Sequence, residues 1–217
     1  AGYWAQKWFF RWGPQDGIPG MLKNMDLVRH VREAIGVAND IMFDCWMGWD
    51  YSYAAKMLEQ ISQYNVRWVE EPLPADRISE YAALRNGTNV PLATGEHEYT
   101  RWGFLQLLQA DAVDVIQADP DWAGGLTEMV KICTLASAYG KPVIPHGHSV
   151  LPALHLIASQ PETVCPMAEF LIKHQPAAQF FHKTYVEPQD GAFALPTGPG
   201  LGIEIDQSRV LKRARVT

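Results

Sequence analysis

The sequence predicts an α/β protein of the TIM type, a parallel (β/α) barrel. Two observations lead to this prediction: short apolar stretches alternate with amphipathic helical stretches, and polar residues follow the ends of successive apolar stretches. Such alternation is typical of βαβ units and a parallel sheet. An open dinucleotide-binding sheet would need a GxGxxG turn after its first strand, and the sequence has none. Closure into a barrel is favoured, because a barrel collects its polar residues at the C-terminal strand ends.

The expected elements follow from hydrophobic periodicity. Strands are expected at 5–10, 40–45, 67–71, 91–96, 113–119, 141–147 and 163–170. Helices are expected at 25–36, 51–65, 77–87, 102–112 and 125–140, where apolar residues recur at i, i+3, i+4 and i+7. Gly36 and Gly140 stand where two of these helices should end.

The length of the chain bears on its domain organisation. A complete barrel of this kind has about 250 residues, whereas the sequence has 217. We therefore expect residues 1–175 to form a barrel domain that is incomplete at its N-terminus. Residues 176–217 are rich in turn-forming residues, and we expect them to form a tail that wraps outside the barrel.

Composition excludes several classes of function. The formal net charge is −6 and the basic residues are scattered, which argues against a nucleic-acid partner. No apolar stretch approaches the roughly 20 residues of a membrane span, so we expect a soluble cytoplasmic protein. The three cysteines are far apart without CxxC spacing, and we expect them to be reduced thiols.

Three acids end three successive strands at an even spacing of 26 residues: Asp44, Glu70 and Glu96. In a barrel these ends lie side by side, so the three carboxylates should converge. A hard divalent cation relieves their repulsion, and few carboxylates with room for water suit Mg²⁺ best. Glu98 stays open as a substitute for Glu96 or as a residue that bridges to it through water, and Glu71 is expected to support Glu70 or to belong to the loop.

Two further strand ends provide a candidate base. His146 follows an apolar stretch and Pro145, and Asp119 ends the preceding strand. An acid beside an imidazole selects its tautomer and favours its protonated form, so Asp119 would prepare His146 to take and return a proton. Asp121 stays open as a substitute for Asp119. Zinc bound by the HxH pair of His146 and His148 is a weaker alternative, because the acids outnumber the histidines at these strand ends.

These features together resemble the enolase superfamily, and within it the acid-sugar dehydratases of the mandelate racemase subgroup, most closely the rhamnonate dehydratases. The segments that carry the resemblance are KWFFRWGPQDG 7–17, MFDCWM 42–47, WVEEPLP 68–74, TGEH 94–97, QADPDWAGGLTE 117–128, VIPHGHSV 143–150, AEF 168–170 and PGLG 199–202. The resemblance implies that Asp44, Glu70 and Glu96 bind Mg²⁺. It also implies that Asp119 and His146 are the orienting acid and the base, and that Glu169, protonated, hydrogen-bonds the developing enediolate.

The implied activity is elimination of water from L-rhamnonate or a similar aldonate, after abstraction of the α-proton, to give a 2-keto-3-deoxy acid. Many relatives carry KxK at the second strand, but this sequence has Lys7-Trp8-Phe9, which favours one-base elimination over epimerisation. The resemblance also implies an N-terminal capping domain and a first barrel strand, and we expect both to be absent here. A racemase or epimerase, or a non-catalytic barrel that binds metal or sugar acid, stays open. A homo-oligomer is expected.

Overall fold

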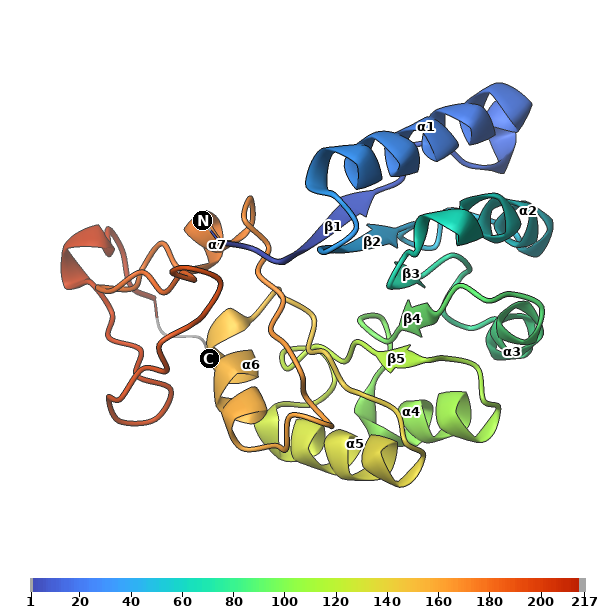
Figure 1. Ribbon diagram of the computed structural model, residues 1–217. Helices are drawn as coiled ribbons and strands as arrows, with labels where there is room; N and C mark the ends of the chain where they lie inside the picture. The colour runs from blue at the N-terminus through green and yellow to red at the C-terminus, as the bar shows by residue number, and fades with distance from the viewer. Residues whose placement is uncertain (1, 215–217) are drawn as a thin grey trace.

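The computed structural model describes residues 2–214 and shows one parallel sheet flanked by helices (Figure 1). The sheet has the strand order β1-β2-β3-β4-β5. Its strands are β1 (Ala5–Phe9), β2 (Asp40–Asp44), β3 (Trp68–Glu70), β4 (Leu92–Thr94) and β5 (Val115–Ile116). The helices are α1 (Gly17–Ile35), α2 (Tyr51–Ile61), α3 (Ile78–Asn86), α4 (Thr100–Gln109), α5 (Leu126–Ala138), α6 (Val150–Ala158) and the short α7 (Gln175–Ala178). The expectation of alternating parallel βα units is confirmed for the first five strands.

Two expected strands are not regular strands. In the segment 141–147, Val143 makes an isolated parallel bridge with Ile116, and its amide donates to Val164 of the segment 163–170 at 2.7 Å. Each segment contains proline, which has no N–H and therefore interrupts a ladder of hydrogen bonds. Both segments thus continue the wall of the barrel without full strand pairing.

Helix boundaries also differ from the expectation. Helix α1 begins at Gly17, eight residues before the expected start at position 25, and α6 was not predicted. Helix α6 reads VLPALHLIA, a nearly continuous apolar run that does not show helical periodicity. Its Pro152 lies in the first turn, where a helix tolerates proline.

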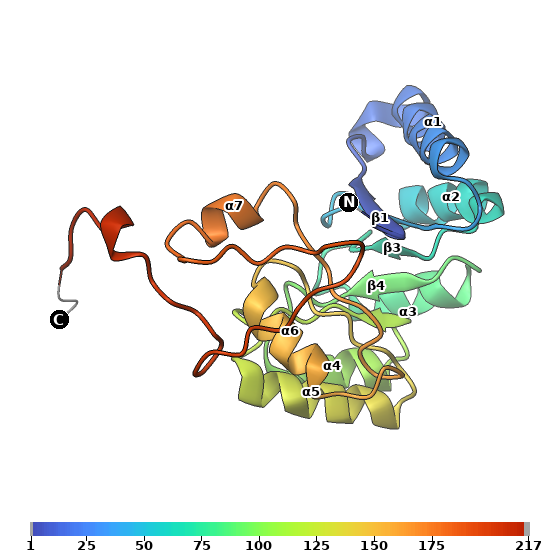
Figure 2. The ribbon, with the colours of Figure 1, turned by 60° about the vertical axis from the view of Figure 1, so that its left-hand side comes forward.

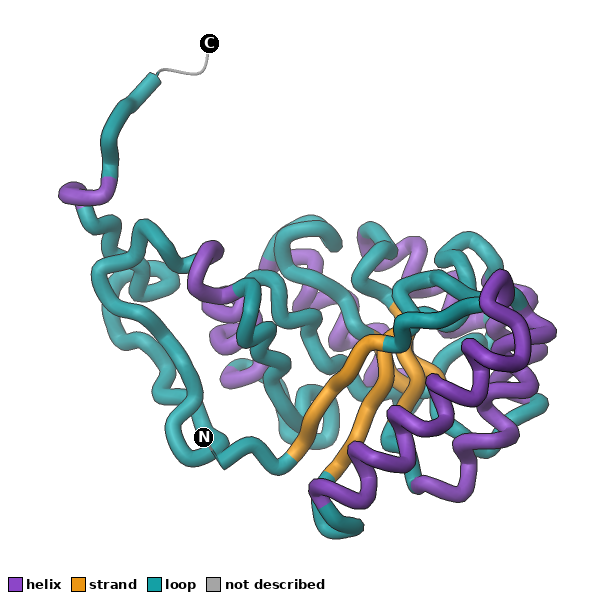
Figure 3. Tube along the Cα trace, turned by 90° about the horizontal axis from the view of Figure 1, so that it is seen from above, coloured by secondary structure: helices purple, strands orange, loops and turns teal. Residues whose placement is uncertain are grey.

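Two apolar clusters lie on opposite faces of the sheet. The smaller cluster fills the inside of the barrel with Met42, Trp68, Ala93, Val115 and Ile144. The larger cluster lies between the strands and the surrounding helices and includes strand residues that alternate with these. Figure 3 shows the strands on the inner side of the ring of helices. Side chains alternate across a strand, so the inward-facing positions at strand ends point into the mouth of the barrel.

The last part of the chain is mostly irregular. Figure 2 shows it running alongside the barrel after α7 and then away from it. Gln175 is fully buried, and its amide nitrogen donates to the carbonyl of Gly147 at 2.7 Å. Residue 175, directly before the expected tail, is thus anchored to the end of segment 141–147, while the boundary there stays a prediction. Among the helices of the described residues, none combines the length and the apolar character of a membrane span.

Arg32 is an 8% exposed side chain that ties the end of α1 to the end of the next βα unit. Its guanidinium donates at 2.7–2.9 Å to four backbone carbonyls, those of Tyr64, Gly36, Asn39 and Asn65. We expect Arg32→Met to lower the free energy of unfolding by about 3 kcal/mol, because the four charge-assisted hydrogen bonds of a nearly buried guanidinium are lost. Urea denaturation followed by circular dichroism measures the change.

The matched control is Arg29→Met on the same helix. Arg29 pairs with Asp26 and Glu33 at the surface, and exposed ion pairs contribute about 0–1 kcal/mol. Equal destabilisation by the two substitutions would contradict the role assigned to Arg32.

Candidate active site

Three of the acids predicted from the sequence lie together at the mouth of the barrel. Carboxylate oxygens of Asp44, Glu70 and Glu96 all lie within 4.8 Å of one another, and the three residues are at most 5% exposed. Asp44 and Glu70 are register partners at the ends of β2 and β3, and Glu96 follows β4. The even spacing in sequence therefore corresponds to neighbouring positions in space.

The position of Glu96 beside the other two acids depends on the glycine that precedes it. Gly95 has φ +134°, a conformation that side chains rarely adopt. A Cβ atom there would lie 2.8 Å from the ring of Phe104 and 3.2 Å from the amide nitrogen of Gln117. Glycine thus lets the chain turn between neighbouring strand ends and place Glu96 in the mouth.

Lys7 provides a positive charge inside this group of acids, a role that was not predicted. Its ammonium lies 2.6 Å from Glu70 Oε1, 3.6 Å from Asp44 Oδ2 and 2.5 Å from Glu169 Oε1. Burial alone would lower the pKa of Lys7, but the three carboxylates outweigh it and raise that pKa well above its usual value. The sequence could have indicated this role, because Lys7 lies in an expected strand and its side chain could therefore point into the barrel.

The acids still carry more negative charge than one lysine balances. Burial, followed by the charge of Glu70, raises the pKa of Asp44 to about 8. Burial also raises the pKa of Glu96 to about 7, against the opposing effect of His146. Protons or cations therefore bind here favourably. Three buried oxygen donors so close together fit a hard divalent cation such as Mg²⁺, and the donor set contains no thiolate or imidazole that would favour zinc.

His146 lies between two acids. Its Nδ1 is 2.7 Å from Asp119 Oδ2 and its Nε2 is 3.0 Å from Glu96 Oε2. Burial lowers the pKa of His146, but the hydrogen bond to Asp119 and the charges of Glu169 and Glu96 raise it to about 9. Both nitrogens of His146 thus have acidic partners, and among the described residues no group of potential metal-ligating atoms contains both His146 and His148.

Glu169 lies in the mouth, beside the ammonium of Lys7. Burial raises its pKa, but Lys7 and His146 outweigh burial and lower that pKa below its usual value. Its Oε2 accepts a 2.7 Å hydrogen bond from the amide of Gly147. The ammonium 2.5 Å from its carboxylate favours the ionised form here, and a protonated Glu169 during the reaction stays a prediction.

Two substitutes considered for the site residues lie elsewhere. Glu98 accepts a hydrogen bond from the amide of Tyr99 and is not part of the group of three acids. Asp121 contacts Ser149 and His148 rather than His146.

A second pair of side chains borders the three acids. Glu71 is 1% exposed with φ +41°, and its Oε2 lies 2.8 Å from His97 Nδ1. Burial and the charge of Glu70 raise the pKa of Glu71 to about 7. Sequence reasoning gave Glu71 only a supporting role and missed His97, although its position directly after Glu96 was a signal.

The chain matches the family model described as "Enolase C-terminal domain-like" over residues 1–209. It is 36% identical to L-rhamnonate dehydratase of Saccharopolyspora erythraea over 98% of this chain and 56% of that protein. The crystal structure of rhamnonate dehydratase from Gibberella zeae complexed with Mg superposes with a TM-score of 0.86, at 33% identity, over 95% of this chain and 52% of that one.

A third neighbour is the 3,6-anhydro-D-galactonate cycloisomerase of Zobellia galactanivorans, with a TM-score of 0.85 at 29% identity over 95% of this chain and 57% of that one. The chain thus spans about half the length of the relatives it matches. Family model, sequence and fold agree, and this chain belongs to the enolase superfamily, as an enolase C-terminal domain-like barrel.

Proposed function

We propose that this chain carries the catalytic barrel of a Mg²⁺-dependent acid-sugar dehydratase that removes water from L-rhamnonate or a similar aldonate. Its similarity to L-rhamnonate dehydratases and to a Mg-bound relative supports the proposal. The observation that carries it is the placement of His146 Nε2 3.0 Å from Glu96, one of the three converging acids. A base at the edge of a cation site can reach the α-proton of a carboxylate bound there.

Asp44, Glu70 and Glu96 would hold the Mg²⁺ ion. Bound there, Mg²⁺ would neutralise the negative charge that builds on the substrate carboxylate when the α-proton leaves. Lys7 adds a fixed positive charge on the same side of the mouth, and Glu169 holds its ammonium at 2.5 Å. An ordered ammonium in a water-poor site stabilises developing negative charge.

His146 would take the α-proton at Nε2 while Asp119 holds Nδ1. The raised pKa of His146 favours the imidazolium, and the charge of Glu96 contributes to the rise. With that charge offset by bound Mg²⁺, His146 would more readily be the neutral imidazole that accepts a proton. The imidazolium of His146 then protonates the 3-hydroxyl, which leaves as water. The resulting enol tautomerises to the 2-keto-3-deoxy acid. Phe9 stands where a second lysine base would be needed for epimerisation, which supports one-base elimination.

The test incubates the protein that carries this chain with L-rhamnonate and Mg²⁺ and measures the keto acid as its semicarbazone. Exchange of the α-proton in D₂O is measured by NMR in parallel. Keto-acid formation with L-rhamnonate and not with its C2 epimer supports the proposal. Mg²⁺ binding without either exchange or product would instead favour a non-catalytic sugar-acid-binding barrel.

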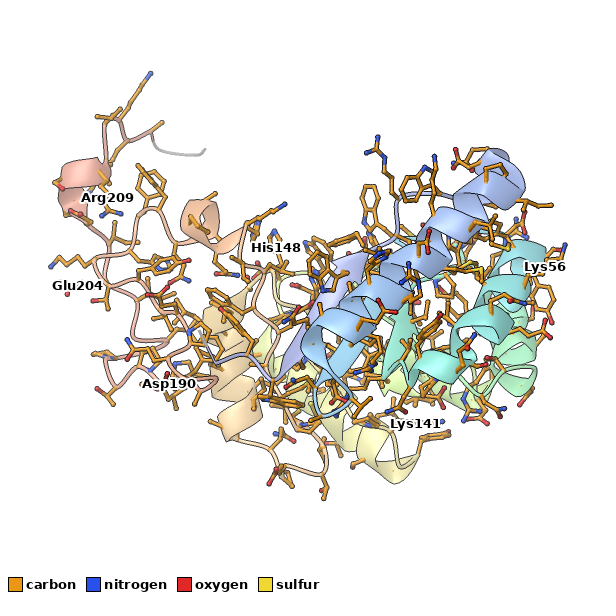
Figure 4. The ribbon with its side chains drawn as sticks, turned by 45° about the horizontal axis from the view of Figure 1, so that its top comes forward. Lys56, Lys141, His148, Asp190, Glu204 and Arg209 are labelled. Carbon is orange, nitrogen blue, oxygen red and sulfur yellow. The ribbon has the colours of Figure 1, made fainter. Side chains whose placement is uncertain are left out.

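Lys7→Met is expected to tighten Mg²⁺ binding by about 10-fold. The ammonium contacts two of the three proposed ligands, so an incoming cation must displace it or lie beside its charge. Calorimetric titration of the metal-free chain measures the change, with Lys56→Met on the outer helix α2 as the control (Figure 4). Weaker binding in Lys7→Met would show that Lys7 orders the ligands rather than competing with the metal.

A further inference from the structure

A second group of metal-ligating side chains lies on the tail side of the mouth. Asp119, Asp121 and His148 offer oxygen and nitrogen atoms that all lie within 4.8 Å of one another. Asp119 is fully buried, whereas Asp121 and His148 are partly open to solvent, with side chains 47% and 35% exposed. We propose that these three residues bind a transition-metal ion of the Zn²⁺ class, separate from the site of Asp44, Glu70 and Glu96.

The geometry of His148 supports this site. Its Nδ1 is enclosed and makes no hydrogen bond within residues 2–214, yet Asp121 Oδ2 lies 3.4 Å away. Two ligands on one tetrahedral zinc ion, each bound at about 2.0–2.1 Å, are separated by about 3.4 Å. The nitrogen and oxygen are thus spaced as ligands of one ion.

The imidazole of His148 is held in place by its surroundings. The ring of His174 stacks on it with centroids 4.3 Å apart, and Trp122 packs against it at 5.3 Å. Gln175 donates to the carbonyl of His148 at 3.2 Å and so joins the tail to this loop. Figure 4 shows His148 where the barrel meets the tail. A ring oriented in this way loses little freedom when it binds an ion.

The chemistry of the donors separates this site from the first. The first site offers carboxylates alone, which suit Mg²⁺, whereas an imidazole with two carboxylates suits Zn²⁺ or Co²⁺. Asp119 Oδ1 accepts a hydrogen bond from the amide of Asp121 at 2.8 Å, which fixes the two acids relative to each other. An ion here would share Asp119 with His146 and so couple this site to the candidate base.

The experiment counts Co²⁺ ions bound to the metal-free protein by calorimetry and follows the visible absorption of imidazole-bound Co²⁺. The unaltered protein is expected to bind two ions. His148→Ala and Asp121→Asn should each lose one ion together with the absorption band, and His30→Ala, which removes a surface imidazole on α1, should keep both. Glu70→Gln should lose the other ion and keep the band.

Two results would overturn the proposal: both ions and the band persist in His148→Ala and Asp121→Asn, or the unaltered protein binds one ion that Glu70→Gln abolishes. The Glu70→Gln variant separates the two sites. If it keeps both ions while His148→Ala loses one, the carboxylate site fails and this site stands.

Discussion

His146→Asn is expected to abolish both exchange of the α-proton and formation of the keto acid, with kcat falling by about 10⁴-fold. One residue would both take the α-proton and return a proton to the leaving hydroxyl, and each general acid–base step contributes about 10²–10⁴-fold. Asparagine keeps a hydrogen-bond donor near Asp119, so the neighbouring acids keep a polar partner. The measurement is turnover of L-rhamnonate at saturating Mg²⁺ in the protein that carries this chain.

The control is His30→Asn, which changes an exposed histidine on α1 outside the mouth. Calorimetry should show that His146→Asn still binds Mg²⁺, because His146 is not a proposed ligand. Undiminished exchange of the α-proton in His146→Asn would refute its role as the base. Loss of Mg²⁺ binding together with activity would instead assign His146 to the metal site.

Glu70→Gln is expected to weaken Mg²⁺ binding by about 100-fold, which corresponds to about 2.7 kcal/mol. Glu70 is 1% exposed; its Oε1 accepts a 2.6 Å hydrogen bond from Lys7, and its Oε2 accepts one from Trp68 Nε1 at 3.3 Å. The substitution keeps the volume and removes the charge, so a change in affinity reports the electrostatic contribution of this carboxylate. Titration calorimetry of the 217-residue chain measures it.

Glu59→Gln on helix α2 is the matched control, because it removes one acid from the chain at a position outside the mouth. Circular dichroism must show that Glu70→Gln is folded before its affinity is compared. Equal Mg²⁺ affinity in the two variants would mean that the three acids do not form the metal site.

Local patterns determined the layout of the barrel. Apolar strand residues alternate with helical stretches, and this predicted β1 to β5 and helices α2 to α5 near their observed positions. The same pattern located the six residues that gather at the mouth. It worked because parallel βα units place the C-terminal end of every strand on one side of the sheet.

Periodicity failed where other forces decide the conformation. Helix α6 is apolar almost throughout, so its sequence shows no apolar face opposite a polar one. The helix is stabilised instead by the packing of Val150, Leu151 and Leu154, against the tail among other residues. Prolines break the ladder in segments 141–147 and 163–170, and only tertiary contacts hold these segments in the wall.

The sequence by itself predicted the acids and the histidine at the strand ends, whereas the tertiary structure added Lys7 and His97 to them and decided the charges and partners of all these groups. The ammonium of Lys7, a residue 162 positions away in the chain, lowers the pKa of Glu169 against the effect of burial. The pairing of Glu71 with His97 likewise exists only once β3 and the loop after β4 are adjacent. Residue type and spacing follow from local chemistry, whereas a pKa depends on burial and on charges that folding brings within a few ångströms.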